Sequence, residues 1–358
     1  MSKRIEWLDS IKGFSILFVV YCHYIMLPKN TFLGNILMTM ATCGVPCFMM
    51  VSGALMHNSH SFNWKKYFKR IFTVYLVMCL WKVIYLAVSF VILDVQFTFN
   101  ELIRYLFLFG GLSNVPSSVM WYMVAFILVM LVYPISYHLL NDESSNGKLY
   151  IFLLLLSFLS GFGVTFVNYI LTLISNIFDV PTINFNALYE VLPLRQHSNL
   201  LFFFLLGGLL FKNDECIKQK LKTIKFGGVL PIALIVIGVC GLMLMKFITA
   251  RTFLWEGINI DNGYQRISAI FLAVGVWLSF SLYSNKVSTF LAKNIGKYTM
   301  GVYYLHFIIL FVCARCIYPY IPQYIIGMNF IKTLLIVFLS VLITRIMLKI
   351  PIVKMLVK

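Results

Sequence analysis

The sequence predicts an all-α integral membrane protein with about ten transmembrane helices and both termini in the cytoplasm. Of its 358 residues, 61% are hydrophobic and only 11% are charged, whereas about a quarter of the residues in a soluble domain are charged. The mean hydropathy is +0.90. The apolar residues form blocks of about 20, each long enough to cross the roughly 30 Å of hydrocarbon in a bilayer. Basic residues gather in alternate loops, which indicates the orientation of the chain.

The apolar blocks leave little sequence for a soluble domain. The sixth block is short and contains Gly207 and Gly208, so we expect it to be tilted or broken. No internal repeat is evident, which argues against a transporter built from inverted repeats. The expected spans cover residues 8–27, 34–56, 69–93, 118–140, 149–175, 198–211, 226–247, 267–284, 298–318 and 330–350.

The first apolar block is expected to be a retained span rather than a cleaved signal peptide. Lys3 and Arg4 precede it, as basic residues precede a signal, but it has no small-residue cleavage site. It also carries Lys12 and His23, which do not belong in the apolar core of a signal peptide.

Lysine and arginine gather in the loops that follow the second, sixth and eighth spans and in the C-terminal tail. Cytoplasmic loops carry an excess of these residues, so both termini are expected inside. The loops at 28–33, 94–117, 176–197, 248–266 and 319–329 are poorer in basic residues and are expected outside. The loop at 141–148, with Asp142, Glu143 and Lys148, is neutral to acidic and does not indicate on which side of the membrane it lies. The basic residues are Lys65, Lys66, Lys69 and Arg70, then Lys212, Lys218, Lys220, Lys222 and Lys225, then Lys286, Lys293 and Lys297, and last Lys349, Lys354 and Lys358.

The longer outside loops combine aromatic and polar residues, among them Tyr189, Arg195 and Trp255. This combination suits carbohydrate, but it is also typical of any membrane interface. Both interpretations stay open for these loops.

The net charge of +17 does not indicate nucleic-acid binding here, because the basic residues lie in short loops between apolar blocks. The eight cysteines lie almost entirely within apolar blocks, where cysteine acts as a small hydrophobe. Cys313 and Cys316 have CxxC spacing, but they lie inside an expected span without a second pair. No metal-binding cluster is predicted.

The stretch LDSIKGFSILFVVYCHY (8–24) places Lys12 and His23 eleven residues apart in one expected span. On an α-helix this separation is about 1100°, three turns plus roughly 20°, and about 16 Å along the axis. The two side chains are therefore predicted to share one face, with Lys12 near the cytoplasm and His23 in the outer half. Asp9 lies three residues before Lys12 and is expected to pair with it. The partner of His23 must come from another span.

Two structural interpretations compete with a functional one. Lys12 could extend its ammonium to the inner headgroups, and His23 could be a packing residue. Ionisable groups within a span are costly and usually functional, however. A cytoplasmic donor such as coenzyme A could place its phosphates at Lys12 and the basic 65–70 segment. Its thioester could then reach His23, which is suited to removing a hydroxyl proton near neutral pH.

The first span resembles that of the membrane acyltransferase 3 family, whose pattern is an aspartate, a basic residue, ten residues and a histidine. The stretch RIEWLDSIKGFSILFVVYCH supplies Asp9, Lys12, Gly13 and His23. Arginine is commoner than lysine at the basic position, and lysine is the weaker phosphate clamp.

The resemblance continues in order along most of the chain. The family's second span resembles GVPCFMMVSGALM (44–56), and its basic inner loop resembles NWKKYFKRIFTVY (63–75). Its Trp-Tyr/Phe segment with a later proline resembles VMWYMVAFILVMLVYPI (119–135). The segment LFFFLLGGLLF (201–211) resembles the family's glycine-bearing short span. The segment IGKYTMGVYYLHFII (295–309) resembles the family's late Tyr-x-x-His segment.

The resemblance implies a single membrane acyltransferase domain over residues 1–358, without the family's optional soluble extracytoplasmic domain. It implies transfer of an acyl group from acetyl-CoA or another acyl-CoA to a hydroxyl of a cell-envelope polysaccharide or glycolipid. Acetyl is the leading candidate for the acyl group. The setting would be the inner membrane of a bacterium, in contact with lipid and a glycan or lipid-linked sugar. Neither metal nor nucleic acid is implied.

The same resemblance assigns expected roles to named residues. His23 would be essential, as a base or an acyl carrier, and Lys12 would assist it. The donor's phosphates would meet Lys12, Lys65, Lys66, Lys69 and Arg70, although these loop residues also fit simple topology. The further candidates are Asp9, Ser52, Trp121, Tyr122, Tyr303 and His306. Several of these candidates also have a structural alternative. Ser52 could serve close packing beside Gly53, and Trp121 with Tyr122 could be an anchor at the membrane interface. His306 could be a packing histidine.

Two other functions remain open from the sequence. A transporter or flippase of a lipid-linked saccharide would need no acyl donor and no indispensable histidine. A structural subunit of a polysaccharide synthase complex would tolerate loss of His23.

Overall fold

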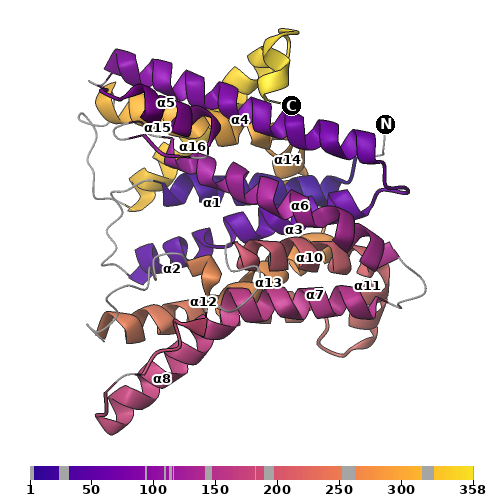
Figure 1. Cartoon of the computed structure of the whole chain (residues 1–358). Helices are drawn as coiled ribbons and strands as arrows, with labels where there is room; N and C mark the ends of the chain where they lie inside the picture. The colour runs from indigo at the N-terminus through magenta and orange to yellow at the C-terminus, as the bar shows by residue number, and fades with distance from the viewer. Residues whose placement is uncertain are drawn as a thin grey trace. The chain divides into compact units, whose positions relative to one another are not determined.

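The computed structural model describes residues 4–23, 32–92, 95–108, 110–112, 115, 117–141, 147–181, 183–188, 197–251, 263–316 and 326–357. These residues are helices joined by turns and short connections, with no β-strand among them (Figure 1). The prediction of an all-α fold is therefore confirmed. Several residues named above lie outside the described ranges: Lys3, Asp142, Glu143, Tyr189, Arg195, Trp255 and Lys358.

The helices follow one another in a simple order. The α-helices of the first half are α1 (Glu6–Cys22), α2 (Phe32–Ala41), α3 (Gly44–His57), α4 (Trp64–Ile92), α5 (Phe99–Phe107), α6 (Trp121–Asn141), α7 (Lys148–Phe158) and α8 (Val164–Phe178). Those of the second half are α10 (Ser198–Lys212), α11 (Asp214–Thr223), α12 (Leu230–Arg251), α13 (Ser268–Leu282), α14 (Lys286–Asn294), α15 (Thr299–Cys316) and α16 (Ile326–Met347). The short helices are η1 (Ser118–Met120), the π-helix η2 (Leu159–Gly163), η3 (Gly263–Gln265), η4 (Gly296–Tyr298) and η6 (Val353–Leu356).

Within the described residues, six helical segments are long and apolar enough to cross a membrane: Phe32–His57, Trp64–Val91, Ser118–Asn141, Lys148–Phe178, Lys286–Arg315 and Phe330–Met347. Ser198–Lys212, Leu230–Met245 and Ser268–Leu282 are shorter apolar helices, and α1 has 17 residues. These helices overlap the expected spans. The number of about ten crossings and the cytoplasmic termini remain predictions.

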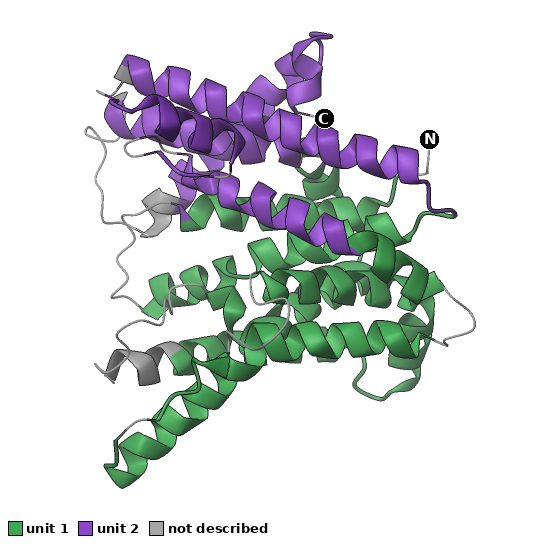
Figure 2. Cartoon of the chain, in the orientation of Figure 1, with its two compact units in different colours: residues 1–22, 29–60, 133–296 green, residues 23–28, 61–132, 297–358 purple. Residues whose placement is uncertain are grey.

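The structure divides the chain into two compact units that alternate along the sequence (Figure 2). Unit 1 contains residues 1–22, 29–60 and 133–296, and unit 2 contains residues 23–28, 61–132 and 297–358. Neither unit is a continuous piece of chain. The single domain expected over 1–358 remains a prediction.

Unit 1 is assembled where glycines let helix backbones approach each other. A Cβ atom on Gly53 of α3 would lie 1.8 Å from the carbonyl oxygen of Phe204 in α10, and one on Gly207 of α10 would lie 2.0 Å from that of Met50. Small residues at helix interfaces are typical of membrane proteins, in which close backbone packing replaces the hydrophobic driving force. The short span with Gly207 is thus an intact helix packed on α3, not a broken one.

Unit 2 is built around α4 and α15, which meet through aromatic side chains. Trp81 stacks on Tyr304 with ring centroids 5.0 Å apart and planes 6° from parallel. The Tyr85 hydroxyl donates to the Tyr304 carbonyl at 3.0 Å, and the Trp81 indole donates to the Leu356 carbonyl in η6 at 2.8 Å. Tyr and Trp suit such a core where the hydroxyl or N–H has an acceptor, as those of Tyr85 and Trp81 do.

The loop expected at 94–117 contains a helix, α5, which begins with a complete capping box. The Thr98 hydroxyl accepts the Glu101 amide, and the Glu101 carboxylate accepts the Thr98 amide at 2.8 Å. The bonds from the Thr98 amide and hydroxyl lower the pKa of the Glu101 carboxyl. Contacts with α4 hold this helix in unit 2.

Candidate active site

The amino-terminal end of α1 carries an ion cluster made of Arg4, Asp9 and Lys12. The Lys12 ammonium lies 2.6 Å from the Asp9 carboxylate, and Arg4 donates to the other oxygen of the same carboxylate. Asp9 is buried and Lys12 is half-buried. The predicted pairing of Asp9 with Lys12 is confirmed. The three groups together have a formal charge of +1, so the cluster attracts anions although its carboxylate is already paired.

The first turns of α1 are held against α14. The Ser10 hydroxyl donates to the Ser288 carbonyl at 2.8 Å. A Cβ on Gly13 would lie 2.7 Å from the Leu291 carbonyl oxygen, and one on Gly296 would lie 2.0 Å from that of Asp9. The sequence therefore places the ion cluster in unit 1 through a serine contact and two glycines.

His23 follows directly after α1 and belongs to unit 2, where it contacts α15. Its ring centroid lies 5.4 Å from that of His306, with the planes at 39°, and 5.4 Å from that of Phe307, edge to face. His306 comes from a different predicted span, as the sequence required of a partner for His23. The shared face with Lys12 remains a prediction, because the helix ends at Cys22 and His23 lies in a turn.

His306 is fully buried and presents one nitrogen without a hydrogen bond. Its Nδ1 lies 3.1 Å from the Val302 carbonyl oxygen of its own helix, whereas Nε2 has no partner among the described residues. A carbonyl accepts only from N–H, so the proton of a neutral ring is assigned to Nδ1 and Nε2 keeps its lone pair. A buried polar atom left in this way calls for a functional reason or an unseen ligand.

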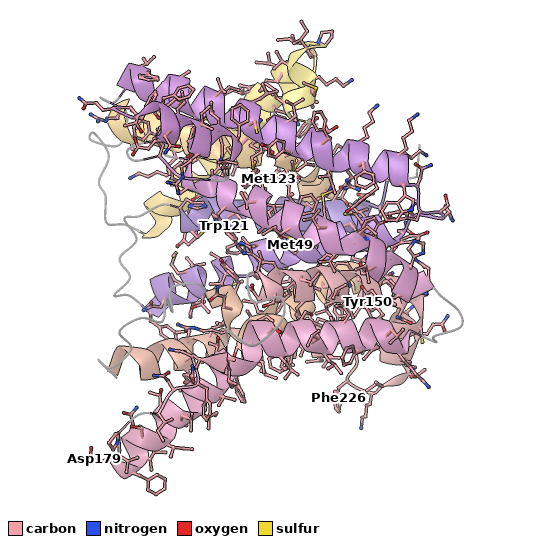
Figure 3. All side chains as sticks on the ribbon, viewed as in Figure 1. Met49, Trp121, Met123, Tyr150, Asp179 and Phe226 are labelled. Atoms are coloured by element: carbon pink, nitrogen blue, oxygen red, sulfur yellow. The ribbon has the colours of Figure 1, made fainter. Side chains whose placement is uncertain are left out.

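Three further candidates continue from this histidine pair within unit 2. The ring of Tyr303 lies 6.1 Å from that of His306 and 5.6 Å from that of Tyr122, and Tyr122 contacts Trp121 at 6.2 Å. The Tyr303 hydroxyl donates to the Val119 carbonyl at 2.5 Å. Trp121 marks the start of α6 in Figure 3. Five predicted residues thus form one aromatic and imidazole cluster, which we call the histidine cluster.

The remaining candidates lie elsewhere. Lys65, Lys66, Lys69 and Arg70 occupy the first two turns of α4, where they are exposed. Ser52 is half-buried in α3, beside the glycine that packs on α10. This neighbour fits the close-packing interpretation of Ser52. The contacts of the basic residues with a donor remain predictions.

The sequence interpretation did not single out two buried lysines in unit 2, Lys82 and Lys332, which are 2% and 1% exposed. A lysine inside an expected span was the available signal, since such residues are usually functional. The Lys82 ammonium donates to the Tyr105 carbonyl at 2.6 Å and lies over the Tyr105 ring.

A cavity of about 420 Å³ in unit 1 was also not predicted. The ends of α3, α6 and α10 surround it, with His57, Asn141 and Lys212 in its wall. His57 is bonded at both nitrogens, to the Gly53 carbonyl at 2.8 Å and the Ser136 hydroxyl at 3.0 Å. Lys212 donates to the Leu140 carbonyl, as a cation at a helix C-terminus does. These contacts are structural.

Comparison with protein families gives one result that covers nearly the whole chain. The family model described as an acyltransferase domain, acyltransferase 3, matches residues 5–348. Neither a curated protein nor a solved structure matches the chain. The matched range includes Asp9 and Lys12 of the ion cluster and all five residues of the histidine cluster. With its apolar helices and this match, the chain belongs to the acyltransferase 3 family of multi-pass membrane acyltransferases.

Proposed function

We propose that this acyltransferase is an O-acyltransferase that moves an acyl group from cytoplasmic acyl-CoA to a hydroxyl of a cell-envelope polysaccharide or glycolipid. Acetyl is the leading candidate for the acyl group. The proposed setting is the inner membrane of a bacterium. The observation that carries the proposal is the contact of His23 with His306, whose buried Nε2 has no partner among the described residues. Paired imidazoles in a membrane protein are suited to proton transfer from a hydroxyl.

In the proposed step His23 is the general base. A ring nitrogen of His23 takes the proton of the sugar hydroxyl while the hydroxyl oxygen attacks the thioester carbon. The carbon–sulfur bond then breaks, and coenzyme A leaves after its thiolate takes up a proton. Such a base contributes about 10²–10⁴-fold to the rate. In the alternative order, His23 first accepts the acyl group and then passes it to the hydroxyl.

In this proposal the ion cluster on α1 binds the anionic phosphate end of the acyl-CoA donor. The support for this binding is the net positive charge of Arg4, Asp9 and Lys12. The exposed cations at the start of α4 are the further candidates for phosphate contacts.

A transfer assay tests the proposed function against the transporter. Membranes that contain the protein are incubated with radiolabelled acetyl-CoA and candidate glycan, and the glycan is then examined by mass spectrometry. The enzyme is supported by label on glycan hydroxyls. Glycan that crosses the membrane with unmodified hydroxyls supports the transporter. A synthase subunit would show neither result, and loss of His23 would have no effect on it.

Replacement of Lys12 by alanine is expected to raise the KM for acyl-CoA by more than the KM for the acceptor. The ammonium is half-buried, and a charge-assisted bond to phosphate is about twice as strong as a neutral one. Lys12→Arg should be tolerated, because arginine keeps the charge and is common at this position in the family. Steady-state kinetics with each substrate varied in turn measures the effect. Equal donor dependence in the wild type and Lys12→Ala contradicts the clamp.

Replacement of His306 by asparagine is expected to lower kcat by about tenfold and to change the pH dependence of kcat. The neighbouring imidazole tunes the proton affinity of His23 but does not take the substrate proton itself. The matched control is His138→Asn, an exposed position on α6. A pH profile that keeps its shape in His306→Asn, with kcat merely reduced, would assign His306 a packing role.

A further inference from the structure

The loop expected outside the membrane at 94–117 contains a helix whose carboxyl end is bonded to the middle of α4. The Lys82 ammonium donates to the Tyr105 carbonyl at 2.6 Å, and the Tyr75 hydroxyl donates to the Phe107 carbonyl at 2.9 Å. The Tyr105 hydroxyl donates back to the Lys82 carbonyl at 3.1 Å. Both α5 carbonyls belong to its last turn, in which backbone acceptors have no partner within the helix.

These bonds give the depth of α5 along α4. Lys82 lies ten residues before the end of α4 at Ile92, which is about 15 Å along the helix axis. This distance is about half of the roughly 30 Å thickness of the hydrocarbon. Tyr75 lies deeper by about 10 Å. Since Phe107 pairs with Tyr75 and Tyr105 with Lys82, α5 runs antiparallel to α4 (Figure 1).

A carbonyl at this depth needs a protein donor, because no bulk water reaches the hydrocarbon. Lys82 supplies this donor, and its charge is favoured by the negative end of the α5 dipole and by the Tyr105 ring at 5.2 Å. Lys82 is 2% exposed, and this arrangement explains why a lysine is buried in an apolar helix.

The chain that follows α5 reaches the histidine cluster. Val119 accepts the Tyr303 hydroxyl at 2.5 Å, and Tyr122 contacts the Tyr303 ring. All of these residues belong to unit 2. The short helix η1 and the first turn of α6 therefore contact Tyr303 of the histidine cluster within the unit that contains α5.

We propose that α5 (Phe99–Phe107) and η1 (Ser118–Met120) belong to a re-entrant element on the acceptor side of the membrane. A saccharide acceptor passes along α5 to the histidine cluster, and Lys82 is the positioning residue that holds α5. The exposed charged groups of Glu101 and Arg104 on α5 supply the polar face. Charged groups at membrane depth face water or protein rather than lipid. The identity of the acceptor as a saccharide rests on the proposed function, whereas the depth of α5 does not.

Cysteine accessibility tests the depth without any activity measurement. Leu108 and Phe99 are 65% and 79% exposed, at opposite ends of α5. In full-length protein in vesicles, Phe99→Cys should react rapidly with a membrane-impermeant thiosulfonate applied from outside. Leu108→Cys, deeper on the helix face of Glu101 and Arg104, should react from outside only slowly and not at all from inside. Both should react after denaturation, with the labelled peptide identified by mass spectrometry. Rapid labelling of Leu108→Cys from outside would overturn the re-entrant assignment.

Kinetics tests the positioning role. Lys82→Met should raise the KM for the glycan acceptor by about tenfold while the KM for acyl-CoA stays unchanged. Lys82→Arg should restore the acceptor KM, since its guanidinium can also donate to the Tyr105 carbonyl. Tyr75→Phe, which loses the bond to the Phe107 carbonyl, should change the acceptor KM in the same direction. Ser89→Ala, which removes a hydroxyl that donates to the Tyr85 carbonyl within α4, is the matched control.

An equal loss of donor and acceptor affinity in Lys82→Met and Tyr75→Phe would overturn the positioning role. If Lys82→Met does not fold, Tyr75→Phe and the accessibility measurement still decide. Failure of the proposed function would appear as absence of acyl transfer in the wild type, with the labelling pattern of α5 unchanged.

Discussion

Replacement of His23 by alanine should reduce acyl transfer by about 10²–10⁴-fold, the range expected for loss of a general base. The imidazole lies beside His306 and Phe307 in unit 2, and alanine offers no atom that accepts a proton. The measurement is transfer of label from acetyl-CoA to glycan under single-turnover conditions, so that product release does not hide the chemical step.

The control for this result is His138→Ala, which removes an exposed imidazole from α6. It should leave transfer unchanged. Equal melting temperatures of wild type and His23→Ala in detergent would exclude misfolding as the cause. Retention of at least a tenth of the wild-type rate in His23→Ala would remove His23 from the chemical step and favour the transporter or the structural subunit.

The two chemical roles of His23 can be separated by rapid quenching. If the imidazole carries the acyl group, labelled acetyl should accumulate on His23 when acyl-CoA is supplied without acceptor. If the imidazole acts as a base, no label should be retained on the protein. Peptide mass spectrometry after quenching distinguishes these outcomes, and both agree with a large effect of His23→Ala.

Replacement of Gly207 by alanine should destabilise the protein by about 3 kcal/mol or more, at the upper end of the cost of overpacking a core. The added Cβ would lie 2.0 Å from the Met50 carbonyl oxygen and 2.4 Å from its Cα. These are backbone atoms of α3, so no side-chain rotation relieves the overlap. The expected result is a lower melting temperature and less folded protein after extraction in detergent.

Gly163→Ala is the matched control within another apolar segment of unit 1. Its added Cβ would meet only the Leu159 side chain, at 3.7 Å, which is an ordinary van der Waals contact. Its melting temperature should stay close to that of the wild type. If Gly207→Ala is as stable as Gly163→Ala, the close approach of α3 and α10 is incorrect.

Several features of this protein could be predicted from its sequence because they depend on neighbours along the chain. The apolar blocks predicted helices of membrane-spanning character, since about 20 apolar residues match the thickness of a bilayer. The three-residue spacing predicted the ion pair of Asp9 with Lys12, which the structure confirms at 2.6 Å. The order of motifs predicted the acyltransferase 3 family, which the match over residues 5–348 confirms.

Other features depend on contacts between residues far apart in the sequence, and only the tertiary structure decided them. His306 as the neighbour of His23 joins positions separated by more than 280 residues. The placement of α5 depends on Lys82, a charged residue within the apolar 69–93 span. Its burial is explained only by its acceptor, the Tyr105 carbonyl, which the structure identifies. Hydropathy records whether a segment is apolar, but it does not record which backbone acceptor a buried donor meets. For this reason the sequence determined the kind of helix at each position, whereas packing decided which helices and side chains meet.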